Sequence, residues 1–324
     1  MELSTSKPRI VILDGFTLNP GDLQWDALEA LGWVARFDFT SEQEVVTRAS
    51  HADILIVNKT AIDAAIMAQL PDLRCICVTA TGYNNIDVEM ARQRGITVCN
   101  VSGYSSDAVA QHVFALILAL SNRVYEHHLS VQQGDWSRCR DFSYSLSPIH
   151  ELAGKTLGIY GFGRIGQAVA RIGQAFGMQL LVTHRRPLEN EAIQVSITEL
   201  FSRGDYITLH APLTAENQGL VNWELLQQMK PSAVLINTSR GALIVEADLR
   251  RALQQRSLAA AALDVLSQEP PPADHPLLGL PNCLITPHNA WASVEARRRL
   301  MDITVKNVAA FLAGSPQNVV GCGL

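Results

Sequence analysis

The stretch KTLGIYGFGRIGQAVARIGQAFGMQLLVTHRRP, residues 155–187, begins as an apolar strand, passes through three glycines and continues as an amphipathic helix. In this pattern Gly161 permits a tight turn, Gly163 lets the backbone approach a pyrophosphate, and Gly166 lets the helix pack on the strand. The N-terminus of the helix offers unpaired N–H groups and a partial positive charge to phosphates. The stretch therefore predicts a strand–turn–helix unit that binds a dinucleotide.

The next strand ends on basic residues, where such a unit usually ends on an acid. His184 lies 18 residues (184 − 166) beyond Gly166, close to the spacing of about 20 expected for the acid that binds the ribose. An aspartate there would accept a hydrogen bond from the 2′-hydroxyl of NAD and would repel a 2′-phosphate. Arg185 could instead hold that phosphate through its guanidinium, and Arg186 could add charge. We therefore expect NADP (NADPH), with NAD as the alternative if these arginines only form a solvated loop.

The composition of the whole chain is that of a globular protein with two domains. The 324 residues are 48% hydrophobic and 18% charged, and a formal net charge of -5 without long runs of one sign argues against nucleic-acid or membrane partners. The N-terminal residues lack the pattern of a signal peptide. The six cysteines form no C-x-x-C pair and stand near no histidine cluster. We therefore expect a cytoplasmic protein with reduced thiols and no metal site.

Short apolar runs alternate with helical patterns in two series. The first series is RIVIL, DILIV, CICVT and ITVCN, and the second is TLGIYG, LLVT, YITLH, AVLIN, AALDV and CLITP. Continuous apolar strands separated by helices imply parallel sheets that are covered on both faces. The predicted fold class is therefore α/β, with two Rossmann-like doubly wound parallel-sheet domains and a cleft between them.

Two long helical patterns set the predicted domain boundaries. One helix over residues 105–128 is expected to carry the chain from the first lobe into the second. A last helix, 293–314, has no strand partner left in the second lobe, so we expect it to return to the first. The predicted domains are residues 1–101 with 291–324, a flavodoxin-like substrate-binding domain, and residues 102–290, a dinucleotide-binding Rossmann domain.

Three polar residues, Arg240, Glu269 and His288, each follow a predicted strand of the second lobe. Ligands of an open α/β sheet lie outside the carboxyl ends of the strands, so we expect all three on the edge that carries the glycine loop. Arg240 could grip the carboxylate of a 2-keto acid and polarise the keto oxygen, and His288 could donate a proton to that oxygen. Glu269, bonded to the other imidazole nitrogen, would orient the ring and favour its charged form. Taken singly, each residue also fits a structural role: a surface ion pair, a loop acid and a core histidine.

The motifs GFGRIG, NTSRG, DV-x5-P and PHNAWAS together resemble the D-isomer-specific 2-hydroxyacid dehydrogenases, over nearly the whole chain. The resemblance implies that Arg240, Glu269 and His288 are catalytic, and that N–H groups around Thr81, Gly82 and Tyr83 bind the substrate carboxylate together with Arg240. His288 is the remaining substrate contact. It also implies further cofactor contacts, with Asp264 near the nicotinamide amide. These contacts are Arg164, Ile165, Pro212, Thr238, Ser239, Asp264 and His288, beside the three glycines and the strand tip 184–186.

The segments GDWSRCRDFSY and HNAWAS look most like the glycerate dehydrogenase and hydroxypyruvate (glyoxylate) reductase branch. This likeness implies reduction of hydroxypyruvate or glyoxylate to D-glycerate or glycolate, and a homodimer through the nucleotide-binding domains. Within that branch Trp136 would approach the site of the neighbouring subunit. His184 departs from the family's common aspartate, which puts NAD in doubt. Three alternatives stay open: a dehydrogenase of larger 2-keto acids, a dinucleotide-sensing binding protein without activity, and a methyltransferase whose glycine loop binds S-adenosylmethionine.

Overall fold

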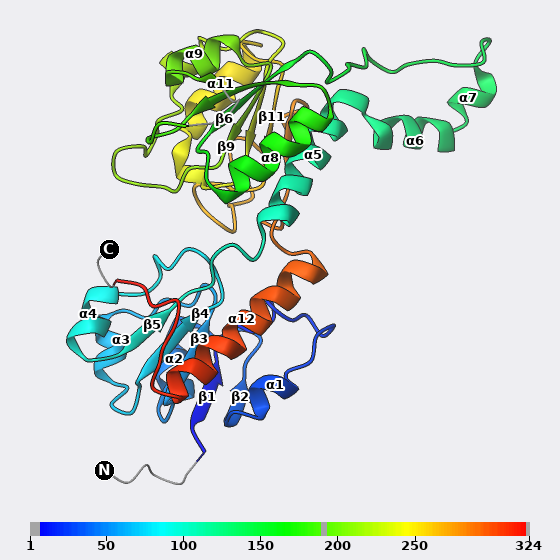
Figure 1. Cartoon of the computed structure of the whole chain (residues 1–324). Coiled ribbons are helices and arrows are strands. Elements are labelled where there is room, and N and C mark those ends of the chain that lie inside the picture. Colours follow the sequence, from blue (N-terminus) through cyan, green and yellow to red (C-terminus); the bar gives the residue numbers. More distant parts are fainter. Residues whose placement is uncertain (1–6, 189–192, 322–324) are drawn as a thin grey trace. The chain divides into compact units, whose positions relative to one another are not determined.

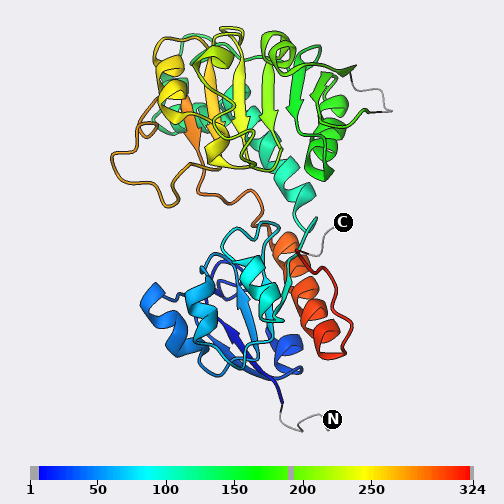
Figure 2. The same ribbon diagram turned by 90° about the vertical axis from the view of Figure 1, so that its left-hand side faces the viewer.

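The computed structural model describes residues 7–188 and 193–321, which fall into two compact units (Figure 1, Figure 2). Unit 1 contains the residues up to Ser105 and those from Ala292 onward, and unit 2 is Ser106–Trp291. The chain leaves unit 1 at residue 105 rather than at the expected 101. Helix α5 (Ser106–Asn122) belongs to unit 2 because it packs against α8 (Arg164–Ala175).

Unit 1 is a five-stranded parallel sheet in the order β2-β1-β3-β4-β5. This is the flavodoxin-like order, in which the chain winds first to one side of the sheet and then to the other. The strands are β1 Arg9–Ile12, β2 Trp33–Arg36, β3 Ile54–Val57, β4 Cys75–Val78 and β5 Thr97–Cys99. The helices are α1 Asp26–Glu29, α2 Val45–Ala49, α3 Ala64–Ala68, α4 Val88–Gln93 and α12 Val294–Leu312, with the 3-10 helix η1 at Glu42–Glu44.

Alternate residues of the unit 1 strands feed two separate cores. Ile54 and Ile56 pack in the core that includes Val308 of α12, whereas Leu55 and Val57 pack in the core on the other face. Successive side chains of a strand point to opposite faces, so a run of four buried residues is what a doubly covered sheet requires. Helix α12 packs on β4, which places the last helix in unit 1.

Unit 2 is a seven-stranded parallel sheet in the order β12-β11-β10-β9-β6-β7-β8. Counted from β6, this is the Rossmann order 3-2-1-4-5-6 with one more strand at the edge. The strands are β6 Thr156–Tyr160, β7 Gln179–Thr183, β8 Ile193–Gln194, β9 Tyr206–Leu209, β10 Val234–Asn237, β11 Ala260–Leu263 and β12 Cys283–Ile285. The other helices are α6 Val124–Gln132, α7 Asp135–Arg138, α9 Ile197–Arg203, α10 Trp223–Leu226 and α11 Glu246–Gln254, with η2 at Gly241–Leu243.

The two faces of this sheet are covered by different helices. Val234 and Ile236 of β10 pack in a core with α5 and α8, whereas Leu235 packs in a core with α9, α10 and α11. Two parallel sheets, each wound on both faces, confirm the predicted α/β class of two doubly wound domains.

The prediction of one helix over residues 105–128 is wrong. Arg123 adopts a left-handed backbone conformation (φ 48°), and the chain bends by 53° between α5 and α6. A left-handed residue cannot continue a right-handed helix, so α6 and α7 run outward from the body of unit 2 (Figure 1). The short strands β2 and β8 are also absent from the predicted series. Phe176, directly after α8, is 40% exposed and stacks on Phe114.

Among the described residues, no single helix is long and apolar enough to cross a membrane. The bent pair α5–α6 would be long and apolar enough when taken together, by length and composition only. The cysteines of this part of the chain are free thiols. Cys75, Cys77 and Cys99 are buried, and Cys139 and Cys283 are partly buried. Cys322 lies outside the described residues.

His210, directly after β9, gives unit 2 a stability that depends on pH. Burial lowers the pKa of its imidazole to about 3. Below about pH 6.5 the unfolded chain binds a proton at His210, whereas the folded chain does not. The contribution of His210 to stability is therefore fully present above that pH and is lost as pH falls toward 3. Denaturant unfolding without cofactor should show that the free energy of unfolding of the wild type falls with pH more steeply than that of His210→Asn. The difference in slope should be at most about 1.4 kcal/mol per pH unit. Parallel curves for the two proteins between pH 7 and pH 4.5 would contradict it.

Candidate active site

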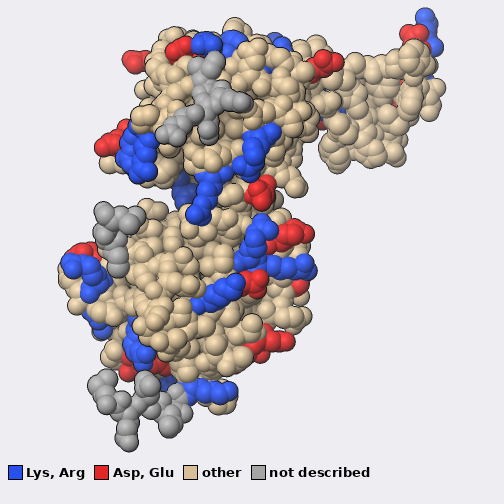
Figure 3. All heavy atoms as spheres, in the orientation of Figure 1, with Lys and Arg blue, Asp and Glu red and all other residues tan. Residues whose placement is uncertain are grey.

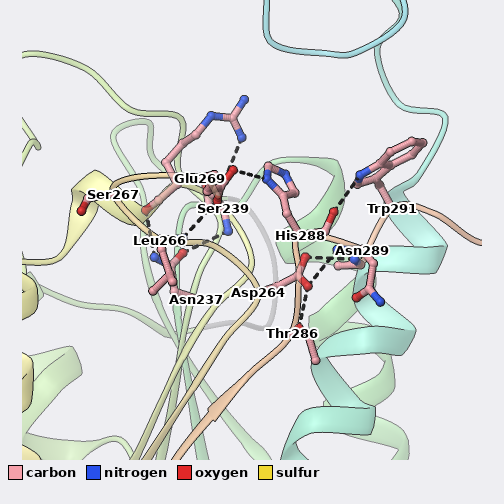
Figure 4. Close-up of polar contacts among 12 residues, drawn as sticks. Asn237, Ser239, Asp264, Leu266, Ser267, Glu269, Thr286, His288, Asn289 and Trp291 are labelled. Atoms are coloured by element: carbon pink, nitrogen blue, oxygen red, sulfur yellow. Dashed lines mark hydrogen bonds and ion pairs between the residues drawn. The ribbon is translucent and has the colours of Figure 1, made fainter. Parts of the chain in front are cut away.

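Arg240, Glu269 and His288 follow three neighbouring strands of unit 2. Strand β10 pairs with β11 and β11 pairs with β12, all in parallel, so the carboxyl ends of these strands share one edge. Figure 4 shows Glu269 and His288 pointing toward one another from the loops after β11 and β12. The expected arrangement of the three residues at one sheet edge is therefore present in the fold.

Glu269 and His288 form a close hydrogen-bonded pair. His288 Nδ1 lies 2.6 Å from Glu269 Oε2, and Glu269 Oε1 accepts a hydrogen bond from the backbone N–H of Leu266 at 3.0 Å. An ionised carboxylate only accepts, so the imidazole proton sits on Nδ1 and Nε2 is the atom left for another group. Both side chains stay partly accessible, at 28% for His288 and 32% for Glu269.

The Arg240 loop packs directly against the Glu269 loop. A Cβ on Gly241 would lie 1.9 Å from the carbonyl carbon of Leu266, so only glycine allows these two backbones to approach so closely. Asn237 Nδ2 donates to the carbonyl of Arg240 at 2.8 Å, and Arg240 Nη1 donates to the carbonyl of Ser239 at 2.8 Å. The guanidinium is thereby anchored at the end of β10.

A second histidine–glutamate pair, absent from the predicted site, holds the loop that carries Glu269. Glu246, the first residue of α11, accepts hydrogen bonds from Ser267 N at 2.7 Å and from Ser267 Oγ at 2.5 Å. The buried His275 reaches the same carboxylate through Nε2 at 3.1 Å. The loop is therefore tied to α11 two residues before Glu269. The sequence offers no sign of this pair, because each residue alone reads as a helix start or a loop residue.

His288 itself occupies an unusual backbone conformation. Its φ is 51°, in the left-handed region that residues other than glycine seldom adopt. The carboxylate of Asp264 fixes the residues that follow, because Oδ1 accepts from Asn289 N at 3.0 Å and Oδ2 accepts from Ala290 N at 2.9 Å. Trp291 Nε1 donates to the carbonyl of His288 at 2.9 Å. Asp264 thus supports the His288 turn, and its contact with a nicotinamide amide stays a prediction.

The glycine loop of unit 2 fits the pyrophosphate of a dinucleotide. Gly161 has a φ of 93°, and a Cβ there would lie 2.5 Å from Ala211 N. A Cβ on Gly166 would lie 2.2 Å from the carbonyl oxygen of Gly161, so this glycine lets α8 pack on the loop. A Cβ on Gly163, which precedes the first residue of α8, would meet nothing within 4 Å. Open space at the N-terminus of a helix is where a pyrophosphate binds.

The remaining predicted cofactor residues surround this loop. His184 Nδ1 accepts a hydrogen bond from Phe162 N at 3.2 Å, which ties the tip of β7 to the glycine loop. Thr238 Oγ1 is buried without a partner among the described residues, and Ser239 Oγ donates to Ala211 O at 2.6 Å. The exposed residues are Arg164, Arg185, Arg186 and Pro212, and Ile165 is partly buried.

Thr81, Gly82 and Tyr83 lie in unit 1, on the loop after β4. Thr81 Oγ1 donates to Val101 O at 3.0 Å, and Asn100 Nδ2 donates to Thr81 O at 2.7 Å. The loop is therefore well ordered within its own unit, and its role in binding a substrate stays a prediction. In residues 7–188 and 193–321 no three His, Cys, Asp or Glu side chains gather into a group that could hold a metal ion.

Gly163 and Gly166 offer a matched pair of alanine substitutions. Gly163→Ala should fold normally but bind a reduced nicotinamide dinucleotide, tested as NADPH and as NADH, at least tenfold more weakly, because its methyl group would occupy the open space. Gly166→Ala should instead lower stability by about 1–3 kcal/mol, because its Cβ meets backbone. Denaturant unfolding and titration of NADPH fluorescence measure the two effects. Unchanged NADPH affinity in Gly163→Ala, with the fold intact, would contradict this account of the loop.

Comparison with known proteins matches the chain to one family. Residues 114–290 match the family model described as D-isomer specific 2-hydroxyacid dehydrogenase, NAD binding domain. The hydroxypyruvate reductase of Blautia hydrogenotrophica is 47% identical over 96% of this chain and 99% of its own. The glycerate dehydrogenase of Methylorubrum extorquens is 42% identical over 86% of this chain and 88% of its own.

A solved structure agrees with these matches. The NADPH-dependent glyoxylate/hydroxypyruvate reductase of Sinorhizobium meliloti, in complex with NADP and malonate, superimposes with a TM-score of 0.82 at 29% identity, over 98% of this chain and 97% of that one. The family description and this neighbour support a nicotinamide dinucleotide as cofactor. By these matches the chain belongs to the D-isomer specific 2-hydroxyacid dehydrogenases, in the branch of the glycerate dehydrogenases and hydroxypyruvate reductases.

Proposed function

We propose that this protein reduces a small 2-keto acid, hydroxypyruvate or glyoxylate, to D-glycerate or glycolate at the expense of NADPH. The observation that carries the proposal is the Glu269–His288 pair, at 2.6 Å, on the sheet edge that also holds Arg240. The names of the relatives supply the substrates, because they include hydroxypyruvate reductase, glycerate dehydrogenase and glyoxylate reductase. A dehydrogenase of larger 2-keto acids is the alternative that a substrate panel would reveal.

The chain's own residues divide the work of the reaction. A nicotinamide dinucleotide held at the glycine loop, by Gly161, Gly163 and Gly166, would supply the hydride that reduction of the keto carbon requires. Arg240 binds the substrate carboxylate and polarises the carbonyl, since a guanidinium holds such groups through paired hydrogen bonds. His288 donates the proton on Nε2 to the keto oxygen, so that this proton on oxygen and a hydride on carbon together convert the keto group to an alcohol. Glu269 keeps the ring oriented through Nδ1–H and stabilises its positive charge before the proton leaves.

Selection of NADP rests on the tip of β7. His184 stands where an acid would repel the 2′-phosphate, and its ring is tied back to Phe162 N. Arg185 and Arg186 follow it on the surface, where both guanidinium groups can reach an anion. The S. meliloti relative is an NADPH-dependent enzyme whose structure contains NADP, which supports the same choice here.

Unit 1 would supply the rest of the substrate site, with N–H groups around Thr81, Gly82 and Tyr83 binding the carboxylate. Unit 2 would then be the dinucleotide-binding domain. With five free cysteines among its described residues, the protein suits the reducing cytoplasm.

We also propose that the protein is a homodimer through an arm of unit 2, defined as Val124–Ile149. Figure 3 shows the face of α6 and α7 turned to the viewer with few charged side chains. The arm's exposed apolar side chains are Val124, Tyr125, Leu129, Val131, Trp136, Phe142, Leu146 and Ile149. Many exposed large apolar side chains on one segment are typical of an interface, so light scattering should give twice the chain mass of 35.4 kDa. Tyr125→Asp with Phe142→Asp should give a monomer, and a monomeric wild type would contradict the dimer.

The reaction is tested by following NADPH absorbance with hydroxypyruvate, glyoxylate, pyruvate and phenylpyruvate. His288→Asn should lower kcat by about 10²–10⁴-fold, because it removes the proton donor while asparagine tolerates the left-handed backbone. Gln69→Ala, on the surface of unit 1, is a control that should leave kcat unchanged. A wild type inactive toward every acid would favour the binding-protein alternative, and a rate unchanged in His288→Asn would remove the proposed acid.

Cofactor choice is tested at the two arginines. Arg185→Gln with Arg186→Gln should lower kcat/KM for NADPH about tenfold or more and leave that for NADH within threefold, because only the 2′-phosphate is lost as a partner. Arg203→Gln, an exposed arginine paired with Glu199, is the matched control. Equal kcat/KM of the wild type for NADPH and NADH would contradict the proposal, as would a preference for NADH.

A further inference from the structure

A chain of three polar side chains connects helix α5 to the turn that carries His288. His112 Nε2, on α5, lies 3.0 Å from Thr286 Oγ1 and 3.5 Å from Asp264 Oδ1. Thr286 Oγ1 donates to Asp264 Oδ1 at 2.6 Å, as Figure 4 shows for these two residues. All three residues belong to unit 2, and His112 is 174 residues from Thr286 in sequence.

The direction of each hydrogen bond in this chain follows from chemistry. A carboxylate has no proton to give, so the single hydroxyl proton of Thr286 goes to Asp264. Thr286 Oγ1 can then only accept from His112, which requires the proton of His112 to be on Nε2. One oxygen of Asp264, Oδ1, receives Thr286 Oγ1 and Asn289 N and uses both of its lone pairs.

Asp264 needs all of these donors because its carboxylate is 1% exposed. A desolvated carboxylate is costly unless hydrogen bonds replace water. The same carboxylate holds Asn289 N and Ala290 N, the two residues after His288, and through Thr286 it holds the second residue before it. A left-handed conformation such as that of His288 persists only where its surroundings enforce it, at a cost of about 1–3 kcal/mol.

We propose that His112 is a positioning residue for the proton donor of the reaction, acting on the His288 turn through Thr286 and Asp264. The N–H of His112 directs the hydroxyl of Thr286 toward Asp264. The carboxylate then keeps its hydrogen bonds to Asn289 N and Ala290 N, and the imidazole of His288 stays aligned with Glu269. This inference rests on the proposed function, in which His288 gives up the proton. The ring of His112 meets Thr286 and Asp264, and these two residues transmit its effect to the turn.

The test compares four variants of the full-length protein. His112→Leu removes the donor, His112→Gln keeps an N–H at the end of a side chain of similar reach, Thr286→Val removes the hydroxyl, and a double variant combines His112→Leu with Thr286→Val. His112→Leu and Thr286→Val should each lower kcat for hydroxypyruvate about tenfold, with the KM for NADPH within twofold. The double variant should be no more than about threefold slower than the slower single variant, because both act on one connection. His112→Gln should restore kcat to within threefold of the wild type.

Several results would overturn the proposal. A kcat of His112→Leu within twofold of the wild type would do so, as would losses that multiply in the double variant. If His112→Gln is as slow as His112→Leu, at equal melting temperature, the donor is not what matters. A lower melting temperature with unchanged kcat would assign His112 to stability alone.

A second readout does not depend on turnover. The proton on His288 Nδ1 should give a downfield NMR signal, identified by its loss in His288→Asn. That signal should shift or broaden in His112→Leu and stay in place in His112→Gln. If the wild type reduces no 2-keto acid while the signal responds in this way, the proposed function fails and the positioning role stands. An unchanged signal in His112→Leu would overturn the positioning role whatever the activity.

Discussion

The candidate site depends on the hydrogen bond between His288 Nδ1 and Glu269 Oε2, at 2.6 Å. Because a carboxylate only accepts, the bond decides that Nδ1 carries the ring proton and leaves Nε2 available to another group. The two residues are 19 positions apart and come from different loops. They meet only because β11 and β12 pair in parallel and end at the same edge. The proximity of His288 and Glu269 is therefore a product of sheet register, and a slip of that register would separate the pair without changing either loop.

Most strands of both sheets could be predicted from the sequence, because doubly covered strands are continuous apolar runs. All four residues of β3, β4, β9 and β10 are buried, so each run stands out from its polar flanks. Strand β2 is different, since three of its four residues are exposed at the edge of the sheet. The break at Arg123 could not be predicted either. No glycine or proline marks it, and the left-handed backbone there reflects tertiary context rather than local propensity.

The candidate site divides in a similar way. Arg240, Glu269 and His288 could be found because residues after strand ends collect at one edge, and Gly161, Gly163 and Gly166 because their spacing reflects close backbone approach. The groups that hold them could not. Glu246 contacts His275, 29 residues away in sequence, and His112 contacts Thr286, 174 residues away. None of these four residues has a local sequence feature that points to its partner. Spacing reports on backbone geometry, whereas such side-chain pairs are specified only once the sheet is assembled.

These hidden partners share a physical logic, in which a carboxylate collects the N–H groups of a loop at a sheet edge. In unit 1, Asp14 receives the backbone N–H groups of Asn58, Lys59 and Thr60 after β3. In unit 2, Asp264 accepts the backbone N–H groups of Asn289 and Ala290 after His288, and Glu246 accepts the backbone N–H and the hydroxyl of Ser267. A loop has no ladder to pair its backbone, so one acceptor that takes several donors orders it at the cost of a single buried charge. The same arrangement therefore recurs in two sheets of different strand number. Each acid comes from a different segment from the N–H groups that it accepts, so the loop itself need not carry the residue that orders it.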